Sequence, residues 1–268
     1  MSPERRFEFG KNWASFLDVL DEERIAGSMK SLSKLAGGDL AGRSFLDVGS
    51  GSGLSSLAAM RLGVGRVHSF DYDPASVACT RELRRRYFPE DPRWTVERGD
   101  ALDRDYLIQL GGFDIVYSWG VLHHTGRMWS ALENVAARAA PGGRLLLALY
   151  RDQGLESRIW TGIKRLYNAH PIGRATVVGV FVPAFVLRGG ITDLLRFRDP
   201  RKRYREYKSL RGMSRVHDWY DWLGGWPFEV AAAHDVIEFH RRRGFELIRL
   251  HEGRGSNRNH EYTFRRTS

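Results

Sequence analysis

The chain has almost no cysteine and lacks a hydrophobic leader. Cys79 is the single cysteine among 268 residues, so an internal disulfide is excluded, as is usual in a reducing compartment. No apolar run approaches the length that a membrane span needs, and the N-terminus carries Glu4, Arg5 and Arg6 instead of a signal peptide's apolar segment. We therefore expect a cytoplasmic protein.

Acidic residues are also scarce relative to basic ones, 32 against 42, which gives a formal net charge of +10. Much of this excess lies in residues 194–211, where eight Lys and Arg residues stand against two acidic ones. Such a charge run is usually a solvated face. It is also able to contact a phosphorylated substrate, anionic lipid headgroups or RNA, of which nucleic acid is the less favoured partner.

A glycine loop at residues 49–53 joins a hydrophobic strand to a helix that begins near Leu54. Glycines let the backbone turn sharply and approach a ligand closely, and the start of the helix adds a partial positive charge. A phosphate loop of the Gly-Lys-Ser/Thr type is excluded, because Gly53 is followed by Leu54 and Ser55.

The spacing of the loop also fails the dinucleotide fingerprint. In Gly-x-Gly-x-x-Gly/Ala, the last position would be Leu54 counting from Gly49 and Ser56 counting from Gly51. Asp47, just before the loop, would repel a pyrophosphate but could orient the ammonium of an amino acid. A nicotinamide cofactor is therefore disfavoured, and a cofactor with ammonium, carboxylate, ribose and adenine parts fits better.

Two further acidic residues follow the next two strands. Asp71 ends the strand 67–70, where a carboxylate can accept hydrogen bonds from both hydroxyls of a ribose. Asp100 follows the strand 94–98. Each of them could instead cap the helix that comes after it, so both readings remain open at this point.

Together these features resemble the class I S-adenosylmethionine-dependent methyltransferases. The resemblance rests on residues 47–53, Asp71, Gly99-Asp100 and the strand 113–119 that runs into Gly120-Val121-Leu122-His123-His124, and it covers roughly residues 40 to 150 well. It implies S-adenosyl-L-methionine as the cofactor, with the glycines near its methionine part, Asp71 on the ribose and Asp100 near the adenine. The cofactor-binding residues predicted in this way are Asp47, Gly49, Ser50, Gly51, Gly53, Asp71, Tyr72, Asp100, Ala101, Ser118 and Trp119.

Alternating strands and helices predict a doubly wound α/β fold. We expect a seven-stranded, mainly parallel, Rossmann-like methyltransferase sheet with an antiparallel last strand and a mostly helical cap insertion. One helix is expected over Met128–Ala140, where Pro141-Gly142-Gly143 would stop it. The predicted parts are an N-terminal helical segment, the cofactor-binding core, the cap, and a C-terminal helix and hairpin that complete the sheet, at residues 1–39, 40–150, 151–228 and 229–268 respectively.

The cap is expected to build the substrate pocket over the carboxyl edge of the sheet. Ala175–Leu187 is almost wholly apolar, interrupted by Gly179 and Pro183 and too short to span a bilayer. It could be a buried helix, a wall for an apolar substrate or an interfacial anchor. Residues 212–227 are dense in aromatic and polar side chains, which is typical of a site wall or of a plug between cap and core. The predicted substrate-binding residues are Trp13, Tyr150, Arg215, Trp219, Tyr220 and Trp222.

Methyl transfer is an in-line displacement at a sulfonium carbon, so the protein mainly aligns the reactants. A hydroxyl acceptor also needs a base, and imidazole titrates near working pH. His123 and His124 follow the fourth strand, and at most one of these neighbours should face the substrate. The predicted catalytic residues are His124, His123 and His217. No metal is predicted, because Gly120 and His123 stand where some ubiquinone-type O-methyltransferases carry acidic ligands.

We therefore expect a transferase that methylates oxygen of a small or lipid-linked hydroxylated molecule, such as a sugar, a quinol or a natural product. Three alternatives remain: an RNA methyltransferase that uses the basic stretch, a cofactor-binding protein without methyl transfer, and a nicotinamide oxidoreductase. The Asn/Asp-Pro-Pro-Tyr/Phe signature of amine-directed enzymes is missing after the strand 113–119, where Ser118-Trp119-Gly120-Val121 stands. DNA and glutamine N-methylation are accordingly disfavoured.

Overall fold

A single seven-stranded sheet organises the protein. The computed structural model describes residues 13, 16–199, 215–253 and 259–267, but not the side chains of residues 215–218 and 221. The strands are β1 (Ser44–Val48), β2 (Arg66–Asp71), β3 (Trp94–Arg98), β4 (Phe113–Trp119), β5 (Ala139–Tyr150), β6 (Phe245–His251) and β7 (Asn259–Arg266). Their order is β3-β2-β1-β4-β5-β7-β6, and only β7 runs antiparallel to its neighbours. The predicted sheet, with its antiparallel last strand, is confirmed.

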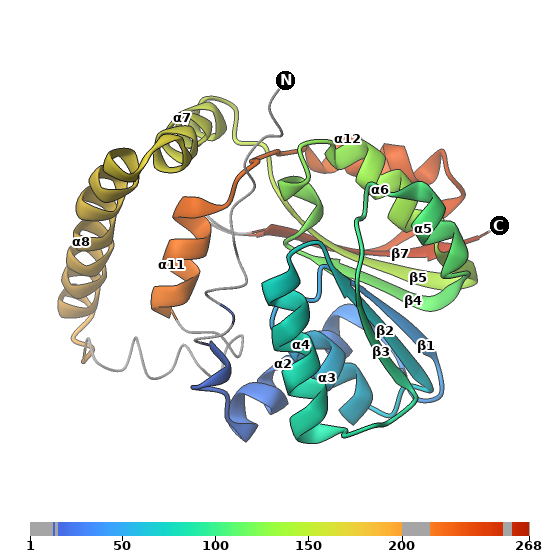
Figure 1. Cartoon of the computed structure of the whole chain (residues 1–268). Helices are drawn as coiled ribbons and strands as arrows, with labels where there is room; N and C mark the ends of the chain where they lie inside the picture. The colour runs from blue at the N-terminus through green and yellow to red at the C-terminus, as the bar shows by residue number, and fades with distance from the viewer. Residues whose placement is uncertain (1–12, 14–15, 200–214, 254–258, 268) are drawn as a thin grey trace.

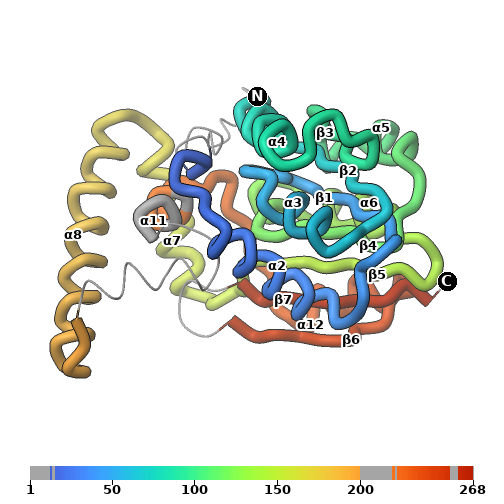
Figure 2. Tube along the Cα trace, turned by 90° about the horizontal axis from the view of Figure 1, so that it is seen from below, coloured from blue at the N-terminus to red at the C-terminus, as the bar shows by residue number. Residues whose placement is uncertain are grey.

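Helices cover both faces of this sheet (Figures 1 and 2). On one face lie α2 (Glu22–Ala36), α3 (Leu54–Arg61) and α4 (Pro74–Tyr87), and on the other α5 (Arg104–Gln109), α6 (Met128–Ala136) and α12 (Ala233–Arg241). Successive strand residues point to opposite faces, so Phe45 and Ile115 join the first core whereas Leu46 and Val116 join the second. Burial of both faces explains why these strands carry apolar residues at successive positions, such as Phe45-Leu46 and Ile115-Val116.

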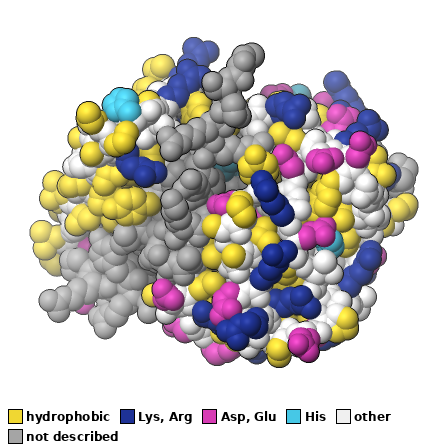
Figure 3. Space-filling view, in the orientation of Figure 1, with side chains coloured by type: hydrophobic (Ala, Val, Ile, Leu, Met, Phe, Trp, Pro, Cys, Tyr) yellow, Lys and Arg dark blue, Asp and Glu magenta, His cyan; other side chains and the backbone are white. Residues whose placement is uncertain are grey.

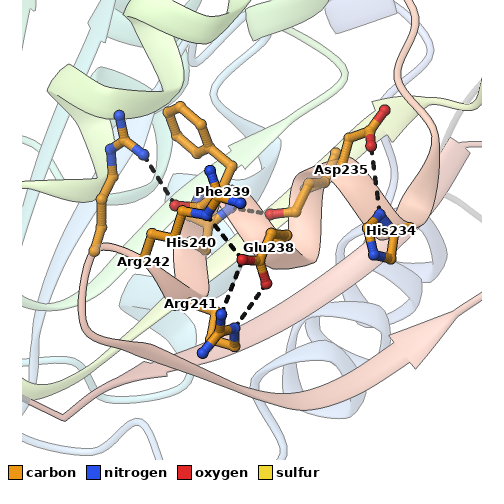
Figure 4. Close-up of polar contacts among 9 residues, drawn as sticks. His234, Asp235, Glu238, Phe239, His240, Arg241 and Arg242 are labelled. Atoms are coloured by element: carbon orange, nitrogen blue, oxygen red, sulfur yellow. Dashed lines mark hydrogen bonds and ion pairs between the residues drawn. The ribbon is translucent and has the colours of Figure 1, made fainter.

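The helix α12 shows how one such layer divides into a buried and a solvated side. His240 is fully buried and stacks on Phe264 of β7, with ring centroids 4.5 Å apart. Burial lowers the pKa of His240 to about 4, so its ring is neutral at physiological pH. On the solvated side, Glu238 accepts hydrogen bonds from Arg241 and Arg242 at 2.7 to 2.9 Å (Figure 4).

The predicted helix Met128–Ala140 extends too far. The helix α6 ends at Ala136, and the Pro-Gly-Gly sequence at 141–143 lies inside β5 instead of after a helix. The register between β4 and β5 shifts just after Phe113, and Gly142 adopts a φ of +75°. Here the glycines allow an irregular strand that still pairs with its neighbour, so tertiary pairing overrides the local helix-stop signal.

The segment after β5 forms a separate helical layer to one side of the sheet (Figure 1). Its helices are α7 (Leu155–Ala169), α8 (Pro171–Leu195) and α11 (Arg215–Gly224). They pack around Tyr167, Val177 and Leu223, which form a small apolar cluster apart from the sheet. The cap insertion is therefore mostly helical, as expected.

The helix α8 differs from our expectation for its sequence. It continues through Gly179 and Pro183 as one helix of 25 residues, which is long and apolar enough to cross a membrane by length and composition. Our expectation that no apolar segment is long enough to span a membrane is therefore wrong, since α8 reaches that length. Contacts of Phe181 with Trp160 and of Phe185 with α11 hold this stretch helical, although proline disfavours it.

Candidate active site

The glycine loop between β1 and α3 needs glycine at each of three positions. Gly49, Gly51 and Gly53 adopt φ values of 78°, 55° and 82°, a region that side chains disfavour. A Cβ atom on Gly49 would also lie 2.4 Å from Val121, and one on Gly53 would lie 3.0 Å from the Cα of Thr80. The loop is therefore shaped by backbone conformation and by close packing against its neighbours.

Asp71, at the carboxyl end of β2, joins this loop to the next strand. Its Oδ2 accepts a hydrogen bond from the Gly51 N–H at 2.9 Å, and its Oδ1 accepts one from the Asp73 N–H at 2.9 Å. The N-cap of α4 is Asp73, which accepts from the Ala75 N–H, so Asp71 is not the helix cap. Burial raises the pKa of Asp71 to about 6, although hydrogen bonds from the backbone N–H groups of Gly51, Asp73 and Tyr72 lower it.

Asp47 lies fully buried under the same loop. Its Oδ2 accepts a hydrogen bond from the Ser56 hydroxyl at 2.5 Å, and Ser56 in turn contacts Ser69 at 2.6 Å. Burial raises the pKa of Asp47 to about 7, and the negative charge of Asp71 contributes to the rise. The loop is thus flanked by two carboxyl groups whose ionisation a nearby cation would favour.

The next predicted cofactor residues lie on the neighbouring loops. Ser50 contacts Thr80 through their hydroxyl groups at 2.9 Å, and Tyr72 is exposed beside the glycine loop's acidic partner Asp71. Asp100 accepts a hydrogen bond from the Leu102 N–H at 2.9 Å, whereas the N-cap of α5 is Asp103. Asp100 therefore shapes the loop after β3 and does not cap α5.

The remaining predicted cofactor residues are more enclosed. Ala101 is buried in the second core, and the Ser118 hydroxyl donates to the Val48 carbonyl at 3.1 Å. The indole N–H of Trp119 donates to Glu261 of β7 at 3.1 Å. These side chains thus fix the ends of β1, β4 and β7 relative to one another.

The two histidines after β4 differ in their surroundings. His123 is fully buried, its Nδ1 accepts a hydrogen bond from the Tyr150 N–H at 3.3 Å, and its Nε2 has no hydrogen-bond partner among the described residues. His124 is only partly buried, and its Nδ1 donates to the Pro227 carbonyl at 2.6 Å. This bond places the basic lone pair of His124 on Nε2.

Both imidazoles are held in the neutral form. Burial and then the positive charge of Lys164 lower the pKa of His124 to about 3, although the Pro227 carbonyl opposes the shift. Burial lowers the pKa of His123 well below its usual value. Of the two, His124 is the more exposed, and its tautomer leaves the lone pair on Nε2, but its low pKa makes that nitrogen a weak base.

Lys164 of α7 is a buried cation that sequence reasoning missed. Its ammonium group donates to the Trp222 carbonyl of α11 and lies 4.9 Å from the ring centroid of Phe228 and 5.7 Å from that of Tyr150. Aromatic faces stabilise a cation at such distances. The signal was present, because Lys164 occupies an apolar position in the periodic pattern of α7, four residues after Trp160.

A small cavity opens between this cluster and the cap. It is lined by Tyr150, Arg151, Gln153, Ser157, Trp160, Trp222 and Phe228. Two predicted substrate residues, Tyr150 and Trp222, therefore meet there. Tyr150 also packs on His123, with ring centroids 3.9 Å apart, which connects the cavity to the histidine pair.

The other predicted substrate and catalytic residues lie elsewhere. Trp219 packs on Phe185 of α8 with centroids 5.6 Å apart, and Tyr220 is exposed on α11. Trp13 covers the glycine loop, since a Cβ atom on Gly51 would lie 3.1 Å from its indole nitrogen. The side chains of Arg215 and His217, residues 200–211 of the basic stretch and residues 212–214 lie outside the described residues.

The chain returns from the cap across this edge in residues 226–231. The Glu229 carboxylate accepts from the Met128 N–H at the start of α6, and the Glu229 N–H donates to the His123 carbonyl at 3.0 Å. The carbonyl of Pro227 in the same segment accepts from His124. Sequence reasoning did not foresee this segment as part of the site, because its contacts join positions about a hundred residues apart.

Comparison with known proteins agrees with this geometry. Residues 46–145 match a family model described as a methyltransferase domain. The ribosomal protein L11 methyltransferase of Xanthomonas campestris pv. campestris is 34% identical over 124 residues, which is 45% of this chain and 36% of that protein. The tRNA U34 carboxymethyltransferase of Methylococcus capsulatus is 32% identical over 120 residues, with the same two shares.

A solved structure extends the likeness in fold to nearly the whole chain. Magnesium protoporphyrin IX methyltransferase from Synechocystis PCC 6803, solved with bound S-adenosylhomocysteine, superposes with a TM-score of 0.54 at 14% identity, covering 91% of this chain and 86% of that one. Residues 46–145 thus match a methyltransferase domain, and the fold is the one found in class I S-adenosylmethionine-dependent methyltransferases, which bind S-adenosyl-L-methionine. The chain spans about a third of the length of the two curated relatives.

Proposed function

We propose that this chain transfers the methyl group of S-adenosylmethionine to an oxygen atom of a small or lipid-linked hydroxylated acceptor, such as a sugar, a quinol or a natural product. One observation carries the proposal. The Pro227 carbonyl accepts a hydrogen bond from Nδ1 of His124, which leaves the lone pair of this histidine on Nε2, and the His124 ring contacts Tyr150 in the wall of an aromatic cavity. The acidic glycine-loop site lies at the same carboxyl edge of the sheet, where open α/β sheets bind ligands.

The glycine loop with its two flanking carboxyl groups fits S-adenosylmethionine better than a dinucleotide. Asp47 and Asp71 would repel a pyrophosphate, but Asp47 suits the ammonium group of the methionine part and Asp71 suits the ribose diol. A carboxylate has about four lone-pair sites and can share them, so Asp71 can accept a ribose hydroxyl in addition to its backbone donors. When bound, the cofactor supplies an electrophilic methyl group, and the protein supplies alignment.

On the acceptor side, His124 would take the proton that a hydroxyl group loses on methylation. Its Nε2 carries the lone pair that would receive this proton. A pKa of about 3, set by burial and by Lys164, makes Nε2 a weak base, so its contribution would lie mainly in holding and orienting the hydroxyl group. Tyr150, Trp222 and Phe228 would contact the acceptor. The cavity that they line has a volume of about 10 Å³, room for one water molecule, so the cap would have to shift to admit an acceptor.

RNA methylation is the second candidate. It is supported by the basic residues 194–211 and by the tRNA enzyme among the relatives. An RNA acceptor predicts binding that falls steeply with salt, whereas an uncharged small acceptor does not. The aromatic walls of the cavity favour the small acceptor.

The first test is isothermal titration of the purified chain with S-adenosylhomocysteine, with NAD as the control ligand. We expect S-adenosylhomocysteine alone to bind. A screen of hydroxylated acceptors with a labelled methyl donor then follows. Binding of NAD alone would overturn the cofactor assignment, and cofactor binding without transfer to any acceptor would favour a regulator or partner subunit.

Cofactor affinity should also depend on pH. In the free protein, burial raises the pKa of Asp47 to about 7 and that of Asp71 to about 6. The ammonium and ribose hydroxyls favour the ionised carboxylates, so binding should release protons, and affinity should fall as pH drops through 7 and 6. We expect a loss of up to about tenfold per pH unit for each proton released.

Titrations at pH 8, 7 and 6, in pairs of buffers with different ionisation enthalpies, measure both the affinity and the number of protons. Asp71→Asn should bind more weakly throughout but show a shallower fall toward pH 6. An affinity that is constant over this range would contradict the placement of the two carboxyls beside the cofactor.

A further inference from the structure

The outer side of α8 carries an unusual amount of exposed apolar surface. Only 11% of its most apolar window is buried. The large hydrophobic side chains exposed on this helix are Ile172, Val180, Val186, Leu187, Ile191, Leu194 and Leu195. Figure 3 shows hydrophobic side chains gathered over this side of the cap. A patch of this kind on a soluble protein usually marks an interaction surface.

The exposed residues form an ordered stripe along the helix. Val180, Ala184, Leu187, Ile191 and Leu195 follow one another at intervals of three or four residues, so they share one face. We call these five residues the α8 stripe. The opposite side of α8 is also apolar but is used inside the cap, where Val177, Phe181 and Phe185 pack in the cluster with α7 and α11.

Positive charge borders the α8 stripe. Arg188 lies within it along the chain, and Arg196 and Arg198 follow its end, all three exposed. The sequence continues with the rest of the basic stretch, and the whole chain carries a net charge of +10. An apolar stripe beside a concentration of Arg and Lys matches the two layers of an anionic lipid surface, acyl chains and headgroups.

We propose that the α8 stripe inserts into the interfacial layer of an anionic membrane, with Arg188, Arg196 and Arg198 on the headgroups. The inner side of α8 packs on α7 and α11, so the helix lies along the surface as part of the cap and does not cross the bilayer. RNA could bind the positive charges, but its charged backbone would not bury the apolar side chains of the α8 stripe. A second copy of the chain could bury the α8 stripe, but the two copies would repel each other because each carries the same positive charge.

This inference narrows the acceptor class. The cap that carries the α8 stripe on its outer side lines the cavity on its inner side through Trp160 and Trp222. Docking would therefore hold the cavity beside the lipid layer, which favours a lipid-linked hydroxylated acceptor; this step rests on the proposed function. The cytoplasmic leaflet is the anionic one, in keeping with the cytoplasmic location that we propose.

Flotation of the full chain with phosphatidylcholine vesicles, with and without phosphatidylglycerol, tests the docking. The test variant is Leu187→Glu with Ile191→Glu, and the matched control is Ile108→Glu on α5, where the isoleucine is 51% exposed against 49% for Ile191. We expect the wild type and the control to bind the anionic vesicles. The test variant should bind roughly tenfold more weakly or worse, because two apolar anchors are lost.

Affinity for S-adenosylhomocysteine should be the same in all three proteins, which shows that the variants are folded. Equal vesicle binding by the wild type and the test variant would overturn the inference, as would failure of the wild type to bind anionic vesicles. A dimer that the test variant dissociates, or binding to tRNA that it retains, would assign the surface to a second copy or to RNA instead. Neither methyl donor nor acceptor enters this assay, so its failure is distinct from failure of the proposed methyl transfer.

Discussion

Asp71→Ala is expected to weaken binding of S-adenosylhomocysteine by roughly a hundredfold or more. The carboxylate would lose hydrogen bonds to the ribose, and each bond to a charged group contributes about 1.5 to 3 kcal/mol. The same change removes the acceptors of the Gly51 and Asp73 N–H groups, so the loop would also lose its shape. Isothermal titration at pH 8, where Asp71 is ionised, measures the effect.

Asp103→Ala is the matched control for this change. Asp103 also follows a strand of the sheet and accepts a backbone hydrogen bond, from the Tyr106 N–H at 3.0 Å, but as the N-cap of α5. Its loss should cost about 1 kcal/mol of stability and leave cofactor affinity unchanged. Wild-type affinity in Asp71→Ala would show that the ribose assignment is wrong, and equal losses in both variants would indicate a general effect of stability.

His124→Ala should lower kcat for a hydroxyl acceptor by about a hundredfold, the low end of the range for a positioned base, because a pKa of about 3 makes this imidazole a weak base. Affinity for S-adenosylhomocysteine should stay unchanged, because His124 lies on the acceptor side. Since its pKa is lowered to about 3, the base is already deprotonated above that pH. The wild-type profile of kcat/KM should therefore show no histidine limb near pH 6.5.

His123→Ala separates a structural histidine from a catalytic one. His123 is fully buried and accepts from the Tyr150 N–H, so its removal should lower the melting temperature while kcat of the folded protein changes little. Full methyl transfer by both His123→Ala and His124→Ala would mean that neither imidazole is needed at this place and that catalysis rests on alignment.

The sheet and its cofactor loop could be predicted from the sequence because their signals are local. The residues of β1 and β4 are apolar on both faces, and the spacing of Gly49, Gly51 and Gly53 matches one backbone path. The end of α6 could not be predicted, because the pairing of β5 with β4 competes there with a local stop signal. The continuity of α8 through Pro183 depends in the same way on packing within the cap.

The acceptor side was only partly predictable. Tyr150 and Trp222 could be predicted as substrate contacts because they are aromatic residues near the expected acceptor edge, and both line the cavity. Lys164 and Pro227 were missed because their roles depend on contacts between segments far apart in the chain. A single cation on an apolar helix face was the one available signal, and it gives no information about its partners.

The insertion leaves and rejoins the sheet at a single place. The Ala231 N–H donates to the Tyr150 carbonyl at 3.1 Å, and the Asp152 N–H donates to the Ala231 carbonyl at 3.0 Å. These hydrogen bonds hold the two ends of the cap next to each other, so a change in the length or sequence of the cap need not move a strand. Residues of the cap can therefore be replaced, inserted or deleted without altering the sheet, so acceptor specificity can change while the cofactor site stays the same.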